Sequence, residues 1–226
     1  FEHWFQISGV EVDSANKAGA VVTLGDSITD GHGATDNGND RWPDDLAARL
    51  HGRAVLNAGL GGNRVLLDGQ GPNALARFDR DVLAQPGVRF VIVFEGVNDL
   101  GMSTKDGEIS PAEHAALVAH IIGAYQQMID RAHIAGLKIY GATITPYMGF
   151  DFYHPTTTNE ADRQAINAWI RTPGHFDAVL DFDRIVADPA YPARLLPKFD
   201  SGDHIHPNAM AYHALADSIP LALFAQ

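Results

Sequence analysis

Four short segments of this sequence combine residue types that can do chemistry together: residues 25–27, 61–63, 96–99 and 203–207. They supply a serine, two kinds of hydrogen-bond donor and an acid next to a histidine. A serine hydroxyl attacks a carbonyl only when a neighbouring base takes its proton, and the oxyanion that forms needs donors aimed at it. Together the segments predict acyl transfer through a serine ester.

Ser27 follows a predicted buried strand. Residues 20–24 form a short apolar run, and Gly25 then permits a sharp turn. Open α/β sheets bind their ligands beyond the carboxyl ends of the strands, so Ser27 is placed where a ligand is expected. A purely structural interpretation also exists, because Asp-Ser after a strand often serves as a helix N-cap.

The C-terminal segment offers an acid and a base at short spacing. Asp203 precedes His206 by three residues, and the Pro207 that follows fits the first turn of a helix. This spacing can turn the two side chains to one side of a tight loop. One ring nitrogen of His206 then takes the proton of Ser27 while Asp203 holds the other nitrogen.

His204 is the competing candidate for the base, and it also forms a His-x-His pair that can bind metal together with Asp203. The sequence has no cysteine and no His-Glu-x-x-His pattern, which are the usual signs of a zinc site. We therefore expect no metal and no organic cofactor. The remaining histidines, His32 among them, have no comparable partner spacing and are expected on the surface or in packing.

Two glycine-containing segments can supply donors to an oxyanion. Residues 54–58 are a second predicted strand, and the glycines that follow, including Gly61 and Gly62, let the backbone approach a ligand and present an N–H. Residues 88–95 are a third strand, which leads into Asn98 and its side-chain amide. Taken singly, each segment also fits an ordinary turn, where glycine and asparagine are common.

In this order and spacing, the four segments resemble the four blocks of the SGNH hydrolases, also called the GDSL esterase and lipase family. The resemblance implies that Ser27 is the nucleophile and that Asp203 and His206 are the acid and the base. It also implies an oxyanion hole made by the N–H groups of Ser27 and Gly62 and by the amide of Asn98. It spans residues 20 to about 220.

Two departures from the family pattern bear on these roles. Ile28 stands where the family name has leucine, an apolar exchange that leaves the turn chemistry intact. The second block has adjacent glycines, so Gly61 competes with Gly62 as the donor, although counting from Asn57 favours Gly62. The Gly-x-Ser-x-Gly motif of the α/β-hydrolase fold is absent, so Ser27 is expected in a more open turn.

Strand and helix patterns alternate along the chain, which predicts a parallel sheet with right-handed crossovers. We expect an α/β fold, a three-layer α/β/α sandwich around a mostly parallel five-stranded sheet of the SGNH or flavodoxin-like kind. Besides the three strands above, residues 137–145 and 178–182 are predicted strands. Predicted helices cover residues 73–84, 110–135, 158–171 and 207–218.

One compact domain is expected over residues 20–226, because no linker, repeat or low-complexity run divides it. Residues 1–19 are predicted to be an N-terminal extension or the tail of an upstream domain. Their first seven residues alternate apolar and polar types, which suits a strand or a flap, and they lack the pattern of a signal peptide.

Composition limits the partners. Twenty-eight acidic against sixteen basic residues give a net charge of −12, which opposes binding to nucleic acid or to anionic membrane. No apolar run has the length of a membrane helix. The absence of cysteine excludes disulfides and thiol catalysis, and it fits an exported bacterial protein, so we expect a secreted, extracellular location.

The substrate is expected to be a short-chain carboxylic ester, either a small molecule or an acetylated polysaccharide. Asp26, Trp42 and Arg64 are the expected substrate-binding residues, because they lie near the carboxyl ends of strands or just after them. The alternatives are a lipid or thioester acyl hydrolase or an acyltransferase of the same family, then a non-catalytic carbohydrate-binding protein, then a metal-dependent hydrolase.

Overall fold

The computed structural model describes residues 9–13 and 19–225. At its centre lies a five-stranded sheet in the order β2-β1-β3-β4-β5, with every neighbouring pair parallel. The strands are β1 (Ala20–Gly25), β2 (Val55–Gly59), β3 (Val88–Phe94), β4 (Lys138–Ala142) and β5 (Ala178–Leu180).

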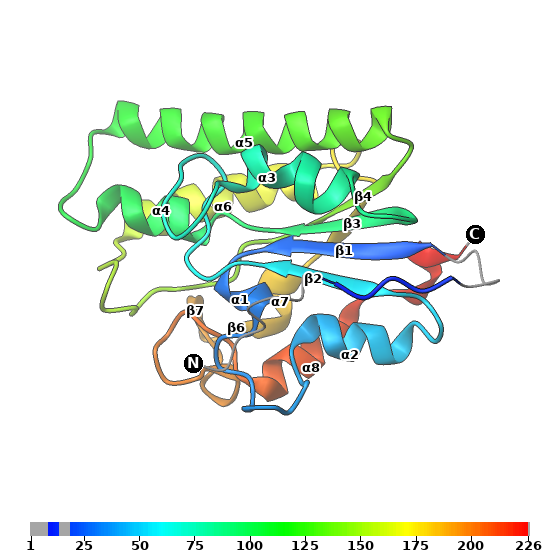
Figure 1. Cartoon of the computed structure of the whole chain (residues 1–226). Helices are drawn as coiled ribbons and strands as arrows, with labels where there is room; N and C mark the ends of the chain where they lie inside the picture. The colour runs from blue at the N-terminus through cyan, green and yellow to red at the C-terminus, as the bar shows by residue number, and fades with distance from the viewer. Residues whose placement is uncertain (1–8, 14–18, 226) are drawn as a thin grey trace.

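Helices cover both faces of this sheet (Figure 1). One layer contains α3 (Ala74–Phe78), α4 (Val97–Thr104), α5 (Pro111–Ile134) and α6 (Thr157–Arg171). The other contains α1 (Ser27–Asp30), α2 (Trp42–Arg49), α7 (Phe182–Val186) and α8 (Ala209–Ser218). The predicted three-layer α/β/α fold is therefore confirmed.

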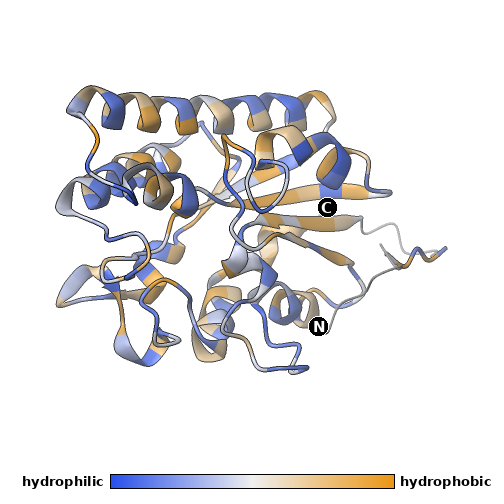
Figure 2. Cartoon of the chain, turned by 60° about the vertical axis from the view of Figure 1, so that its left-hand side comes forward, coloured by the Kyte–Doolittle hydropathy of each residue, from blue (hydrophilic) through white to orange (hydrophobic). Residues whose placement is uncertain are grey.

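The strands are mostly apolar because both faces of the sheet are covered. All six residues of β1 are buried, and β3 is buried from Phe90 onward. Figure 2 shows the hydrophobic strands enclosed between helices that carry both polar and apolar residues. The two edge strands are less covered: β2 is partly exposed along its length, and β5 is partly exposed at its first two residues.

The register of the sheet brings the predicted catalytic segments to one place. Gly25 pairs with Gly59 of β2 on one side and with Phe94 of β3 on the other. Three strands thus end level with one another. The loops that carry Ser27, the glycine pair and Asn98 begin at these ends, so all three leave the same edge of the sheet.

The sequence predicted four of the helices, α3, α5, α6 and α8, with errors at their ends. The capping box of α5 is present: Ser110 accepts from the N–H of Glu113, and Glu113 accepts from the N–H of Ser110. By contrast, Pro207 does not lie in the first turn of α8, because Asn208 is the N-cap and accepts from the N–H of Ala211.

Other elements differ from the prediction or were not predicted. The predicted helix over residues 73–84 is α3 followed by a π-helical turn, Asp79–Leu83. Helices α2, α4 and α7 were not predicted, nor was the antiparallel hairpin of β6 (Ala187–Asp188) and β7 (Tyr191–Leu195). Two 3₁₀ turns, Pro197–Phe199 and Leu221–Phe224, complete the described chain.

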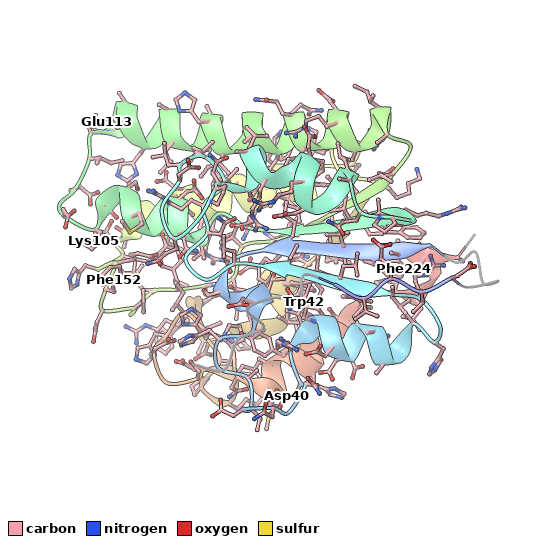
Figure 3. The ribbon with its side chains drawn as sticks, viewed as in Figure 1. Asp40, Trp42, Lys105, Glu113, Phe152 and Phe224 are labelled. Atoms are coloured by element: carbon pink, nitrogen blue, oxygen red, sulfur yellow. The ribbon has the colours of Figure 1, made fainter. Side chains whose placement is uncertain are left out.

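Trp42 is a core residue, so the prediction that it binds substrate is wrong. It opens α2, on the side of the sheet that α2 covers (Figure 3). It is 0% exposed, and its ring packs against the rings of Phe94 and Phe182. The sequence does not show that α2 turns this ring inward, because the contacts come from β3 and α7.

The predicted strand or flap in residues 1–7 lies outside the described residues, and the division into residues 1–19 and 20–226 stays a prediction. In the described part of the chain, none of the helices combines the length and the apolar character that crossing a bilayer requires.

Replacing Trp42 by alanine is expected to lower the free energy of unfolding by about 3–5 kcal/mol, because it leaves a large cavity in a closed core. Urea unfolding measures this change. Tyr191→Ala is the control, since Tyr191 is 68% exposed, and its cost should stay within about 0.5 kcal/mol. Equal costs for the two variants would contradict the packing role of Trp42.

Candidate active site

Ser27 is the first residue of α1, and the turn that leads from β1 into this helix requires glycine at position 25. The preceding Asp26 is the N-cap and accepts from the N–H of Ile28 at 2.9 Å. A side chain at Gly25 would come within 2.0 Å of the Thr29 hydroxyl and 2.8 Å of the Phe94 carbonyl oxygen. One turn thus contains both the N-cap of α1, Asp26, and the predicted nucleophile, Ser27.

Asp26 itself is a structural residue, and the prediction that it binds substrate is wrong. Its side chain is buried, with only 2% exposed, and it is occupied by the cap of α1. Burial is the main cause that raises the pKa of Asp26 to about 7, and the nearby Asp99 contributes to this rise, while the bond from the Ile28 N–H opposes it.

A chain of hydrogen bonds connects Ser27, His206 and Asp203. The Ser27 Oγ lies 2.8 Å from Nε2 of His206, and Nδ1 of His206 lies 2.5 Å from Oδ2 of Asp203. A carboxylate can only accept, so Nδ1 carries the proton and Nε2 accepts from the Ser27 hydroxyl. His206 is thereby held in the tautomer that a general base needs.

The Asp203 carboxylate is fixed by its own loop. Its Oδ1 accepts from the backbone N–H groups of Ile205 at 3.1 Å and His206 at 2.9 Å, and from the Ser201 hydroxyl at 3.2 Å. Because Oδ1 is held in this way, Oδ2 faces the ring of His206. The spacing of three residues in the sequence is what closes this small loop.

The electrostatics of the pair favour a neutral base and an ionised acid. Burial lowers the pKa of His206 below its ordinary value, Asp203 opposes that shift, and His32 adds to it. Burial would raise the pKa of Asp203, but the bonds from His206 and from the backbone outweigh it and lower that pKa. Near neutral pH, His206 is therefore ready to accept a proton.

The glycine segment forms a tight turn beside Ser27. The N–H of Asn63 donates to the carbonyl of Leu60 at 3.0 Å, with Gly61 and Gly62 between them. Gly62 has φ of +71°, and a side chain there would meet Gln70 at 2.7 Å, so this position requires glycine. Both glycines line the cavity that contains Ser27.

Asn98 lies in the first turn of α4, and its amide orientation is fixed from both ends. Its Nδ2 donates to the carbonyl of Asn63 at 2.8 Å, and its Oδ1 accepts from the Tyr153 hydroxyl at 2.7 Å. An amide nitrogen has two hydrogens. Since Asn98 lines the cavity, the second one can serve a bound oxyanion.

Arg77 was not predicted as a site residue, although it supports three of the segments. The guanidinium is 3% exposed and donates to the Gly25 carbonyl at 2.9 Å and the Ala58 carbonyl at 2.7 Å. It also donates to Asn63 Oδ1 at 2.9 Å and lies 3.5 Å from Glu95. No short motif marks this residue.

His32 was expected on the surface or in packing and instead lies at the site. Its ring is 3.9 Å from the ring of His206, at an interplanar angle of 36°. Its Nε2 is 3.7 Å from Oδ2 of Asp203. The sequence gives no signal of this contact, because His32 and the acid–base pair are far apart along the chain.

His204 and Arg64 point elsewhere. Nδ1 of His204 lies 2.6 Å from Asp200, so it does not join Asp203 and His206 as a base or a metal ligand. The Arg64 guanidinium donates to the carbonyl of Asp68 in its own loop, and the prediction that it binds substrate is not supported. In the described part of the chain, the three residues that can hold a metal ion together are His32, Asp203 and His206.

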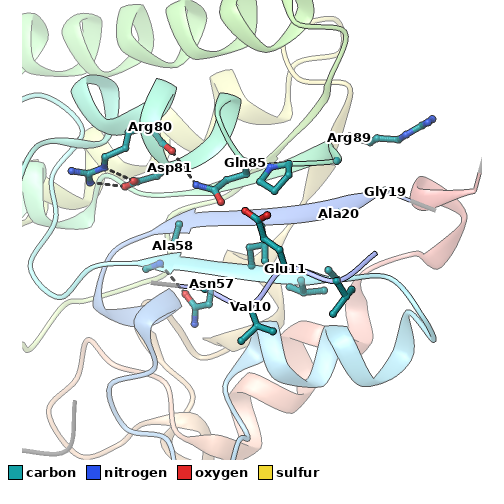
Figure 4. A pocket seen from close by; sticks show the side chains of 18 of the residues that line it. Val10, Glu11, Gly19, Ala20, Asn57, Ala58, Arg80, Asp81, Gln85 and Arg89 are labelled. Atoms are coloured by element: carbon teal, nitrogen blue, oxygen red, sulfur yellow. Dashed lines mark hydrogen bonds and ion pairs between the residues drawn. The ribbon is translucent and has the colours of Figure 1, made fainter. Parts of the chain in front are cut away.

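A cavity of about 330 Å³ connects these groups. Residues from all four predicted segments line it, and so do Phe150 and Tyr153 from the loop between β4 and α6. The full lining is Ser27, His32, Gly61, Gly62, Gln70, Asn98, Phe150, Tyr153, Ile205 and His206. A larger groove of about 1160 Å³ follows the outer strand β2 (Figure 4). Its described lining includes no serine or histidine, so the smaller cavity is the candidate active site.

Solved structures with similar folds include a GDSL-like lipase from Bacteroides thetaiotaomicron, with 18% identity and a TM-score of 0.69 over 94% of this chain and 91% of that one. A G-D-S-L family protein from Desulfitobacterium hafniense has 22% identity and a TM-score of 0.66, covering 88% and 96%. Est24, a carbohydrate acetylesterase from Sinorhizobium meliloti, has 17% identity and a TM-score of 0.56, covering 87% and 94%. These likenesses support the fold.

Among curated protein sequences, none matches this chain significantly. Residues 23–214, most of the chain, match the sequence model of the GDSL-like lipase/acylhydrolase family. That span contains the four segments and the paired acid and base. The chain therefore belongs to the GDSL-like lipase/acylhydrolase family and is a carboxylic ester hydrolase.

Proposed function

We propose that this chain hydrolyses short-chain carboxylic esters in two steps, through an acyl-enzyme on Ser27. The observation that carries the proposal is the hydrogen-bond chain from Ser27 through His206 to Asp203. Ser27 and His206 line a cavity that Gly62 and Asn98 also line, and these two residues are suitable oxyanion donors.

In the first step, the Ser27 Oγ attacks the ester carbonyl carbon while Nε2 of His206 takes the hydroxyl proton. The carbonyl oxygen becomes an oxyanion, which accepts from the N–H groups of Ser27 and Gly62 and from the Asn98 amide. The ester C–O bond then breaks, and His206 returns the proton to the leaving alcohol.

In the second step, water replaces the alcohol. His206 takes a proton from the water as the water attacks the acyl-enzyme, and the same donors hold the second oxyanion. When the bond to Ser27 breaks, His206 returns the proton to the serine and the carboxylic acid leaves. Asp203 stays ionised throughout and supports the imidazolium that forms in each half.

The size of the cavity supports a short acyl group. At about 330 Å³ it lies near the lower limit of ligand pockets, and it must hold the acyl group together with part of the alcohol. Tyr153 and Phe150 both line the cavity and contact each other, with ring centroids 5.0 Å apart, so their rings limit its total space. The limited space favours a short acyl group such as acetyl.

The alcohol half of the ester must lie on the side of His206, which protonates the leaving oxygen. On that side, the ring centroids of Phe150 and His206 are 6.3 Å apart, with an interplanar angle of 83°, and the ring of His32 lies beside that of His206. An aromatic face with a polar rim suits a sugar ring. Since Est24 is named a carbohydrate acetylesterase, we propose acetylated carbohydrate as the substrate class.

Ser27→Ala is expected to lower the turnover of p-nitrophenyl acetate by about 10⁶-fold, because it removes the nucleophile of a coupled triad. Covalent labelling by a fluorophosphonate should be lost at the same time. The matched control is Ser218→Ala, whose hydroxyl only donates to the carbonyl of Leu215 at the end of α8. Near-wild-type turnover of Ser27→Ala would rule out the acyl-enzyme on this residue.

The pH profile tests His206 and Asp203. As the pH is lowered, His206 becomes protonated and kcat/KM should fall. Because burial lowers the pKa of His206, the inflection should lie below pH 6.5. Asp203→Asn should lower kcat by about 10⁴-fold, since the correct tautomer is lost. It should also move the inflection lower, because Asp203 raises the pKa of His206. His204→Ala, the control, should keep the wild-type profile.

The oxyanion donors are tested by Asn98→Ala and Tyr153→Phe. Loss of the amide should lower kcat by about 10²–10³-fold. Loss of the hydroxyl that orients the amide should cost about tenfold, the worth of one hydrogen bond, with little change in KM. Tyr191→Phe on the exposed hairpin is the matched control. An unchanged kcat for Tyr153→Phe would show that the amide needs no support from this hydroxyl.

A further inference from the structure

His32, Asp203 and His206 place three potential metal ligands at the rim of the cavity. One ligand atom of each lies within 4.8 Å of the other two. The His32 Nε2 and the Asp203 Oδ2 are 3.7 Å apart. Tetrahedral zinc with bonds of about 2.0 Å holds its ligand atoms about 3.3 Å apart. Nδ1 of His206 and Oδ2 of Asp203 are 2.5 Å apart in their hydrogen bond. A zinc ion that takes both atoms would displace the Nδ1 proton and move the two atoms apart, while the His32 ring moves closer.

The position of His32 is fixed by the fold, whereas its ring is open to solvent. The Tyr212 hydroxyl donates to the carbonyl of His32, and a side chain at Gly33 would lie 2.7 Å from the Pro207 carbonyl. The loop of His32 is thus held against the segment that carries His206. The side chain of His32 is 59% exposed, so an ion from solution can reach it.

Two imidazoles and one carboxylate are a donor set that zinc binds readily in proteins. We propose that Zn²⁺ binds reversibly to His32, Asp203 and His206 and thereby inhibits the enzyme. The binding follows from the geometry alone, whereas the inhibition rests on the proposed function.

Inhibition follows from the state of His206 in catalysis. Both of its ring nitrogens are already used, with Ser27 at 2.8 Å and Asp203 at 2.5 Å. If the ion takes Nε2, the bond to the Ser27 hydroxyl is lost. If it takes Nδ1, the proton of that nitrogen goes to solvent and Asp203 no longer orients the ring. In both cases His206 cannot act as the base.

The experiment measures Zn²⁺ binding and inhibition separately. Titration calorimetry of Ser27→Ala with Zn²⁺ should show one ion per chain, and Zn²⁺ should inhibit wild-type hydrolysis of p-nitrophenyl acetate, with full recovery on adding EDTA. In His32→Ala and in the size-matched His32→Gln, the inhibition constant should rise by at least about tenfold. Each variant is compared with its own uninhibited rate.

His204→Ala is the matched control, because His204 lies two residues from His206 but bonds to Asp200. Its inhibition constant should equal that of the wild type. Unchanged inhibition in both His32 variants, loss of inhibition in His204→Ala, or no binding of Zn²⁺ in calorimetry would each overturn the proposal. If the wild type hydrolyses no ester, the proposed function fails, and calorimetry on the His32 variants still decides the zinc site.

Discussion

The geometry of the site depends on one buried cation, Arg77. Its guanidinium bonds to the carbonyl oxygens at the ends of β1 and β2, to the Asn63 side chain, and pairs with Glu95 at the end of β3. A buried charge without partners is strongly destabilising. Arg77 and the strand ends therefore stabilise each other. The loops that carry Ser27, the glycine pair and Asn98 all begin at these strand ends.

Asn63 connects Arg77 to Asn98, one of the proposed oxyanion donors. Its Oδ1 accepts from Arg77, its Nδ2 donates to the Pro72 carbonyl, and its own carbonyl accepts from Asn98. Asp99 adds a second connection to the same loop, since its carboxylate accepts from the N–H groups of Val65 at 2.7 Å and Leu66 at 3.0 Å. Donors held in this way need no reorganisation when charge develops on a substrate, which is the condition for strong electrostatic stabilisation.

The sequence predicted the features that depend on local spacing or on strand order. The pairing of Asp203 with His206 closes within three residues, and parallel strands bring their carboxyl ends to one edge, so the fold and the meeting of the four segments could be predicted. Arg77 could not, because in a helical pattern it resembles a surface cation, and its partner carbonyls at Ala58 and Gly25 are 19 and 52 residues away. The contact of His32 with His206 is likewise created only by folding.

The same distinction explains why the sequence predicts the chemistry better than the substrate. The catalytic groups sit directly after strands or within a tight loop, where register and short spacing fix them. Phe150, Tyr153 and Gln70, which line the rest of the cavity, come from loops whose course depends on packing, as the contacts of Tyr153 with Asn98 of α4 and with Phe150 show. Trp42 shows the consequence, since its position after the carboxyl end of a strand indicated a substrate contact, whereas packing against β3 and α7 placed it in the core. Changes in such loops can alter which ester is bound while the buried support beneath Ser27 stays intact.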